Sequence, residues 1–275
     1  TAVAAGLLAG GTRVVLREAN TVSRDLAPAG VRSRALLWLM RRAYRRAAAV
    51  IAVSEGVASD LERHLGVPRA RVTVIANPVL TERVWSGPAT LPDHPWFAPG
   101  EPPVVLGVGR LAPQKGFDTL LRAFAEARRR TACRLLILGE GELRDALLAE
   151  ASALGIVEHV ALPGFADDPF PYMAHAGAFA LTSRWEGLPN ALIQAVALGT
   201  PAVATDCHSG PAEVLDGGEH GALVPVDDVG ALARALVEAL ARPRRSPPQD
   251  WLDRYRPEPV AHAYLRACLG TGGGT

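Results

Sequence analysis

The sequence predicts an α/β protein with two domains, each built around a parallel β-sheet. Short apolar runs such as V-V-L-G-V alternate with longer amphipathic stretches, and strands that are apolar throughout are typical of parallel sheets covered by helices on both faces. A proline-rich segment at 81–103 interrupts this alternation, as an interdomain linker would. A length of 275 residues suffices for two modest domains.

Composition excludes several function classes. Hydrophobic residues make up 49% and charged residues 21%, which fits a packed core rather than a disordered chain. The net charge of +1 argues against a globally basic nucleic-acid binder, so we expect no nucleic-acid partner. No apolar run has the ~18 residues that a spanning helix needs. The three cysteines lie far apart, which argues against a zinc site or disulfide framework and favours a reducing, cytoplasmic location.

The first domain is expected at 1–80 and is incomplete. The chain begins with Thr1 inside a predicted helix (1–8), so we interpret it as truncated at its N-terminus. Only three strands precede the linker, and Ser54 is expected to cap the helix that follows the second of them. The predicted strands are 13–16, 50–53 and 71–75, and the predicted helices are 31–49 and 55–64.

The second domain is expected at 104–248 and has a full α/β series. Its predicted strands are 104–108, 134–138, 160–162, 178–181, 201–204 and 222–224. Its predicted helices are 117–130, 142–154, 189–198 and 229–241, and a break at 243–248 precedes a last helix at 257–269. In parallel sheets of this kind, ligands bind beyond the carboxyl ends of the strands, so the loops that follow the strands are the places to search for a site.

The loop after the strand 104–108 carries two cations. Arg110 and Lys115 flank a glycine-rich turn, where an arginine fork and a lysine point charge could clamp a phosphate. The alternative is that both are solvated loop charges. Lys115 is the single lysine in a chain whose other basic residues are all arginine, which favours a specific role.

The same loop also matches a dinucleotide fingerprint of the form G-x-G-x-x-A, at Gly107, Gly109 and Ala112. That fingerprint needs the helix to open on the third small residue, against the pyrophosphate. Here Pro113 follows and the amphipathic pattern begins only near Gly116, so dinucleotide binding is the weaker interpretation.

The loop after the strand 178–181 offers polar groups at a helix start. Pro189 suits the first helical turn, and the free N–H groups around Asn190 would form an anion site. Glu186 stands just before that helix, and Gln194 lies about two turns further along the same face. Together they could grip two ends of an extended ligand, although a capping glutamate and a surface glutamine would give the same pattern.

Two further loops are candidates. The loop 205–214 could supply backbone amides and a carboxylate, and His208 could act as a general base or simply face solvent. Gly139, after the strand 134–138, could lie close to a base or ribose because it has no side chain.

Taken together, these segments resemble the retaining glycosyltransferases of family 4. The resemblance rests on V-G-R-L-A-P-Q-K-G-F, L-I-L-G-E-G-E-L-R and S-R-W-E-G-L-P-N-A-L-I-Q-A, preceded by V-I-A-V-S-E-G-V and V-I-A-N-P-V, in family order over about 50–240. It implies the GT-B fold, in which two Rossmann-like domains face each other across a donor-binding cleft. It also implies that the segment 249–270 returns to the first domain.

The resemblance further implies roles for individual residues. Arg110 and Lys115 would bind the donor diphosphate, Glu186 would hold donor-sugar hydroxyls, and Gln194 would take the place of the acid that grips the ribose. Together with the catalytic Arg110, Lys115 and Glu186, the nucleotide-sugar site would comprise Gly109, Gly139, Gly164, Phe165, Gly187, Leu188, Asn190 and Gln194. A nucleotide-sugar is the expected co-substrate and a hydroxyl compound the acceptor. No cofactor or metal is expected, since Asp167-Asp168 and Asp227-Asp228 fit turns and helix starts.

The sequence departs from the family pattern in two places. Gln194 lacks the charge of the second acid, which should weaken nucleotide binding, because charge-assisted hydrogen bonds are roughly twice as strong as neutral ones. The loop after the first strand is Arg17-Glu18-Ala19-Asn20 and has no histidine, so Glu18 or Asn20 would face the acceptor. A catalytically silent nucleotide-binding module and an NAD(P)-binding oxidoreductase domain therefore remain as alternatives.

The stretch from Arg32 to Arg46 combines six arginines with Trp38 and several leucines. Such a basic amphipathic helix could lie on anionic lipid, at the inner face of a membrane. The alternative is an ordinary Rossmann helix whose apolar face packs on the sheet.

Overall fold

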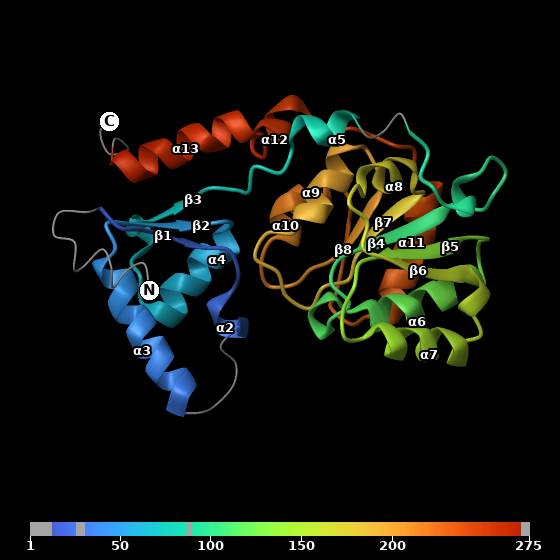
Figure 1. Cartoon of the computed structure of the whole chain (residues 1–275), viewed down its shortest axis with the longest axis horizontal. Coiled ribbons are helices and arrows are strands. Elements are labelled where there is room, and N and C mark those ends of the chain that lie inside the picture. Colours follow the sequence, from blue (N-terminus) through green and yellow to red (C-terminus); the bar gives the residue numbers. More distant parts are fainter. Residues whose placement is uncertain (1–12, 26–30, 87–89, 271–275) are drawn as a thin grey trace.

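The computed structural model describes residues 13–25, 31–86 and 90–270. The helix expected at 1–8 lies outside this part of the chain. The described residues form two α/β bodies side by side, joined by two crossing segments along one edge (Figure 1).

The first body holds a parallel sheet of three strands in the order β1-β2-β3. These strands are Val15–Glu18, Ala49–Ala52 and Val72–Val74. The prediction for β1 was wrong by two residues, because the strand pairs with β2 from Val15 to Glu18. The polar end of β1 is accommodated since Arg17 Nε donates to the Tyr264 hydroxyl and Glu18 accepts from Tyr44.

Helices α2 (Val22–Asp25), α3 (Val31–Arg46) and α4 (Glu55–Asp60) cover this sheet on one side (Figure 1). Ser54 caps α4 as predicted, since its Oγ accepts from the amide of Val57. A π-helical turn at Leu61–Leu65 prolongs α4 until Gly66, whose φ of 63° ends it. The left-handed region costs a glycine little, which suits it to this position.

The second body holds six parallel strands in the order β6-β5-β4-β7-β8-β9. The strands are β4 Val104–Val108, β5 Arg134–Leu138, β6 Val160–Gly164, β7 Ala178–Leu181, β8 Ala202–Thr205 and β9 Ala222–Val224. Four of them have the predicted bounds; β6 runs two residues further and β8 begins one residue later. The chain builds outward from β4 to β6 and then returns to place β7 on the other side of β4. The strand order therefore reverses between β4 and β7, which is where such sheets bind ligands.

Helices cover both faces of the large sheet. One face packs on α6 (Phe117–Arg128), α7 (Arg144–Ala153) and α11 (Val229–Ala241) through residues such as Val105 and Leu135. The other face packs on α8 (Phe170–His175), α9 (Asn190–Ala197) and α10 (Pro211–Val214) through Leu106 and Leu136. Successive strand residues point to opposite faces, which is why nearly every strand residue is apolar.

Two segments connect the bodies. The predicted linker contains α5 (Glu82–Ser86) and a 3₁₀ turn at Pro95–Phe97, neither of which was predicted. After α11, the short α12 (Gln249–Asp253) leads into α13 (Pro257–Leu269), which lies on the small sheet opposite α3 (Figure 1). Val260 of α13 packs there on Ile51 and Ile75. Within the described residues, no helix has the length and apolar character needed to cross a membrane.

Candidate active site

The loops that follow β4 and β7 lie against each other where the strand order reverses. The amide of Arg184 donates to the carbonyl of Gln114 at 2.7 Å, and the Gln114 side-chain amide donates to the carbonyl of Trp185 at 2.8 Å. The Thr182 hydroxyl donates to the carbonyl of Lys115 at 2.8 Å. These three hydrogen bonds fix the two loops relative to each other.

This contact brings Lys115 and Glu186 together. Lys115 Nζ lies 2.5 Å from Glu186 Oε1, and the Ser183 hydroxyl donates to the same oxygen at 2.6 Å. The Glu186 side chain is only 8% exposed and the Lys115 side chain 20%. An ammonium carries three donors and accepts none, so Lys115 keeps donors for a ligand after pairing with Glu186.

A cavity of about 340 Å³ lies at the start of the loop after β4, and its lining includes neither Lys115 nor Glu186. Gly109, against which the alkyl chain of Lys115 packs, forms part of the cavity wall together with Arg110 and Phe165. Phe165 is 74% exposed, and the Arg110 side chain makes no hydrogen bond or ion pair with any described residue. The cavity thus combines an accessible aromatic face with a guanidinium that is available to an anion.

Two of the predicted glycines shape this wall through the backbone. Gly139 has a φ of 143°, and a Cβ there would collide with the carbonyl oxygen of Gly109. Its amide donates to the carbonyl of Gly164 at 2.8 Å, which links the ends of β5 and β6. Gly164 itself, with a φ of 101°, lies against the side chain of Glu140, which lines the cavity.

The remaining predicted residues lie toward the first body. Gly187 is buried, with its carbonyl accepting from the Ser54 and Ser209 hydroxyls, and a Cβ on it would collide with the carbonyl of Ala19. Leu188 is also buried.

The side chains of Asn190 and Gln194 also contact the first body. Asn190 Oδ1 accepts from Asn77 at 2.7 Å. Gln194 Nε2 donates to the carbonyl of Val79 at 3.4 Å, so Gln194 and Glu186 both lie near the junction but have different partners.

The loop after β8 provides structural groups rather than a nucleophile. Cys207 is buried, and burial raises the pKa of its thiol to about 12. His208 is exposed and makes no polar contact with any described residue. Glu213 accepts hydrogen bonds from the amides of Glu55 and Gly56, at 2.7 and 2.9 Å, and so connects the two bodies.

Sequence reasoning missed one group at the site, a brace centred on Arg184. Its guanidinium contacts Asp118 and Asp227 and the carbonyl of Pro113. These hydrogen bonds raise the pKa of Arg184, and the bond from Arg184 lowers the pKa of Asp227. The motif S-R-W-E-G contains Arg184, but no local pattern indicates that its carboxylate partners come from α6 and the loop before α11.

Pro189 and the helix starts show smaller differences from expectation. Pro189 is the N-cap of α9 and not a first-turn residue. Helix α6 begins at Phe117, five residues after Ala112, so the loop lacks the geometry of the dinucleotide fingerprint. Asp228 caps α11 as a helix-start residue, with its side chain accepting from the amide of Ala231.

Among the described residues, no group of three or more histidine, cysteine or acidic side chains could hold a metal ion.

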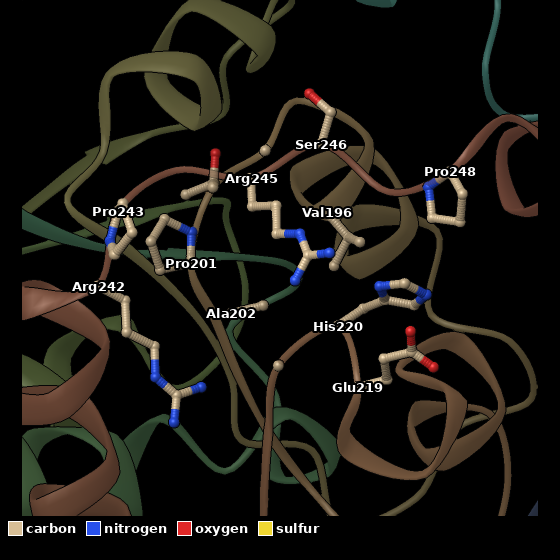
Figure 2. A pocket seen from close by; sticks show the side chains of 13 residues that line it. Val196, Pro201, Ala202, Glu219, His220, Arg242, Pro243, Arg245, Ser246 and Pro248 are labelled. Carbon is tan, nitrogen blue, oxygen red and sulfur yellow. The ribbon is translucent and has the colours of Figure 1, made fainter.

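A second hollow, of about 550 Å³, lies at the opposite end of the strands. Residues that precede β8 and β9 line it, and Arg245 and His220 face it (Figure 2). It contains none of the predicted site residues. Because ligands of doubly wound sheets bind at the carboxyl ends, we take the β4–β7 reversal as the candidate site.

A doubly wound second body facing a smaller α/β body, with the site at the strand-order reversal, defines the GT-B class of glycosyltransferases. The family described as Glycosyl transferases group 1 matches residues 102–242, and Glycosyltransferase Family 4 matches residues 1–83. The chain belongs to this family of glycosyltransferases, which confirms the resemblance noted from its motifs.

Two of the relatives that the chain resembles are named as sugar transferases. The chain is 33% identical, over 82% of its length, to N-acetylgalactosamine-N,N'-diacetylbacillosaminyl-diphospho-undecaprenol 4-alpha-N-acetylgalactosaminyltransferase of Campylobacter jejuni. It is 39% identical, over 54% of its length, to a GDP-mannose-dependent alpha-(1-6)-phosphatidylinositol monomannoside mannosyltransferase of Mycolicibacterium smegmatis. The chain spans 60% of the first relative and 41% of the second.

Solved structures show the same fold at low identity. Anabaena HepE in complex with UDP superposes with a TM-score of 0.75 at 20% identity, covering 98% of this chain and 75% of HepE. WaaG, a glycosyltransferase involved in lipopolysaccharide biosynthesis, gives a TM-score of 0.72 at 19% identity, covering 95% of this chain and 77% of WaaG. These similarities confirm the GT-B fold.

Proposed function

We propose that this chain carries the donor site of a retaining glycosyltransferase that moves a sugar from a nucleotide-diphosphate donor to a hydroxyl acceptor. The observation that carries the proposal is the contact between Lys115 Nζ and Glu186 Oε1 at the strand-order reversal. It joins a cation suited to phosphate and a carboxylate suited to sugar hydroxyls at one point of the sheet.

The roles follow from the geometry. The nucleoside would lie in the cavity beside Phe165, with its base against the exposed ring. Arg110 and Lys115 would contact the diphosphate, and Glu186 would accept hydrogen bonds from the donor sugar. The bond between the anomeric carbon and the β-phosphate oxygen breaks while the acceptor oxygen attacks from the same face, and the acceptor's hydroxyl proton passes to the leaving diphosphate oxygen. Arg110 and Lys115 stabilise the negative charge that develops on the leaving diphosphate, so the proposed reaction needs no metal ion.

Related structures support a nucleotide ligand without fixing its base. HepE was solved with UDP, and separately with UDP and glucose, whereas the mycobacterial relative is named as dependent on GDP-mannose.

Titration calorimetry with UDP, GDP, ADP and NAD⁺ tests the proposal. We expect binding of one nucleoside diphosphate, unchanged by EDTA, and loss of that binding in Arg110→Ala. The matched control is Arg130→Ala, an exposed arginine at the end of α6 whose side chain has no polar partner among the described residues. Binding of NAD⁺ alone would support the oxidoreductase alternative and overturn the proposal.

A catalytically silent nucleotide-binding module is the second candidate. It is favoured by Gln194, whose neutral amide already donates to the Val79 carbonyl, and by Ala19 in the loop where the family often has a histidine. Incubation with the nucleotide-sugar that binds most tightly separates the two. Release of free sugar or its transfer to an added acceptor supports the enzyme, whereas binding without turnover supports the silent module.

We further propose that α3 contacts an anionic membrane surface. Trp38 and Leu39 are 60% and 55% exposed on this helix, next to Arg42, whose guanidinium lies 5.8 Å from the centre of the Trp38 ring. The buried side of the helix is formed by Tyr44, with Leu37 and Met40 partly buried against the core. Exposed aromatic and basic side chains on one helix are typical of interfacial binding. The side chains of Arg32 and Arg34 lie outside those the structure describes.

Co-sedimentation with liposomes tests this contact. We expect binding that rises with the fraction of phosphatidylglycerol and falls in Trp38→Ala/Leu39→Ala. The control is Leu265→Ala, which removes an exposed leucine from α13, on the other side of the small sheet. Binding that is independent of anionic lipid would contradict the proposal.

A further inference from the structure

Arg184 lies where four segments of the second body converge. Its backbone amide donates to Gln114 O, and its Nη1 donates to Pro113 O at 2.7 Å, so both ends of the residue hold the loop after β4. Its Nη2 donates to both oxygens of Asp118, on α6, at 3.0 and 2.8 Å. Its Nε contacts both oxygens of Asp227, before α11, at 3.0 and 3.2 Å.

The partner carboxylates are themselves held in place. Asp227 has a φ of 59°, and such left-handed backbone in a residue other than glycine persists only where its surroundings fix it. The Thr119 hydroxyl donates to Asp227 at 2.8 Å. Arg122 donates to Asp118 from the outer side at 2.5 Å. The brace is therefore a fixed fork and not a mobile surface ion pair.

The Arg184 brace lies next to Lys115 and Glu186, but Arg184 forms its ion pairs with Asp118 and Asp227 and not with Glu186. Arg184 sits two residues before Glu186, and the two carbonyls it holds belong to the residues just before Lys115. Two carboxylates neutralise the guanidinium, which leaves it no role as a phosphate ligand. The effect that remains for Arg184 is on the positions of the loop after β4 and the loop after β7.

We propose that Arg184 is a positioning residue, which sets the contact between Lys115 and Glu186 by fixing the loop after β4 against the loop after β7. A fork with five donors in one plane can serve two carboxylates and a carbonyl together, which a lysine or glutamine cannot do. The role of Lys115 and Glu186 toward a donor diphosphate rests on the proposed function. The positioning of these two residues by Arg184 does not depend on it.

Lys115 gives a direct measurement of this contact, because it is the only lysine in the chain. Acetylation by a dilute acyl donor, followed by peptide mass spectrometry, measures the reactivity of this one amine, with the N-terminal amine as internal reference. In the wild-type protein the ion pair and burial should protect Lys115. In Arg184→Gln, which introduces no second lysine, we expect labelling to accelerate about fivefold, the size of a coupling lost between neighbouring groups.

Four further variants make the result specific. Arg122→Gln also removes a partner of Asp118 but touches neither loop, so its labelling rate should equal that of the wild type. In Glu186→Gln the pair is already broken, and adding Arg184→Gln should change the rate less than about twofold. Asp227→Asn removes only one of the two carboxylate partners of Arg184, so Lys115 should be labelled at an intermediate rate. If Arg184→Gln does not fold, the labelling rate of Asp227→Asn tests the proposal instead.

Wild-type labelling of Lys115 in a folded Arg184→Gln protein, or in Asp227→Asn if the former is unfolded, would overturn the proposal. So would equal acceleration by Arg184→Gln with and without the Glu186 carboxylate, because Arg184 would then act independently of the pair. No nucleotide is present in this experiment. Failure of the wild-type protein to bind any nucleotide would overturn the proposed function and leave the positioning result standing.

Discussion

At the scale of single residues, Lys115 shows why one lysine remains in a chain that otherwise uses arginine. Its alkyl chain packs on Gly109, where a Cβ would lie 3.2 Å from Cε, and its amine ends on a carboxylate that is almost fully buried. An ammonium is a compact point charge that fits this narrow position, whereas a planar fork needs more room. The lone lysine predicted a special position, but its partner Glu186 emerged only from the fold.

Replacement of Lys115 by alanine tests this position. We expect the rate of sugar transfer to fall by the equivalent of ~3–4 kcal/mol, if loss of one donor to a developing oxyanion is a fair guide. Stability should fall as well, because Glu186 would keep a buried charge without its partner. Transfer kinetics together with urea unfolding measure the two effects.

Lys115→Ala/Glu186→Gln separates the two effects. The neutral amide removes the unpaired charge, so stability should recover while transfer remains slow. Unchanged transfer in Lys115→Ala would remove this residue from the mechanism.

Asp216 provides a test of pH dependence. Two hydrogen bonds from Arg254 lower its pKa below the ordinary value of 3.8. A carboxyl group whose pKa is lower in the folded state stabilises the protein above its unfolded pKa, and this contribution is lost as the pH falls through the folded pKa. We therefore expect Asp216→Asn to lower the Tm at neutral pH and to match the wild type in acid, below the folded pKa.

The matched variant is Asp145→Asn, which removes an exposed carboxylate that forms no ion pair among the described residues. Its Tm should follow that of the wild type over the same range. A difference between wild type and Asp216→Asn that persists in acid would contradict the assignment.

At the scale of elements, the strands of the second body were predictable and several connections were not. Strands β4, β5, β7 and β9 have the bounds that their apolar runs predicted, because a strand buried on both faces leaves a continuous hydrophobic signal. Helices α5, α8, α10 and α12 each have four to six residues, too short to show a helical period. They form because tertiary contacts hold them, as when Trp251 donates to the carbonyl of Val214.

Gly116 illustrates how an element boundary shapes the site. It precedes α6 with a φ of 61°, and a Cβ there would collide with the carbonyl of Thr182 in the neighbouring loop. Gly155, after α7, has a φ of 68° but no atom within 4 Å of the added Cβ. We expect Gly155→Ala to cost about 1–2 kcal/mol of unfolding free energy, the cost of the left-handed conformation. Gly116→Ala should cost clearly more.

Urea unfolding of both variants measures the difference. Equal destabilisation would mean that the loops after β4 and β7 can separate without cost, which would contradict the close contact between them.

At the scale of the whole molecule, the two bodies meet through the loops that follow their strands. The hydroxyl oxygens of Ser54 and Ser209 lie 2.8 Å apart, and each lies within hydrogen-bond distance of the Gly187 carbonyl. Next to them, two amides of the first body donate to Glu213. One hydrophobic cluster also runs through both bodies, from Val50 to Leu192. The site at Glu186 is therefore bordered by the first body.

Removal of the Glu213 carboxylate tests this junction. Two amides at the start of α4 would lose their acceptor in Glu213→Ala, and we expect the bodies to separate more often. Small-angle X-ray scattering should give a larger radius of gyration. Glu238→Ala, which removes an exposed carboxylate 4.0 Å from Arg242, is the control and should scatter as the wild type does. An unchanged radius in Glu213→Ala would mean that other contacts hold the junction.

The sequence by itself determined the fold class, the large sheet and the loops that form the candidate site, because apolar runs and the loop motifs that carry charges are local signals. Tertiary structure alone decided which charges meet. Lys115 and Glu186 are far apart along the chain, and Asp118, Arg184 and Asp227 come from three different segments. Their contacts depend on the order of the strands, since placing β7 beside β4 brings these loops to one edge of the sheet, and no local pattern encodes that order.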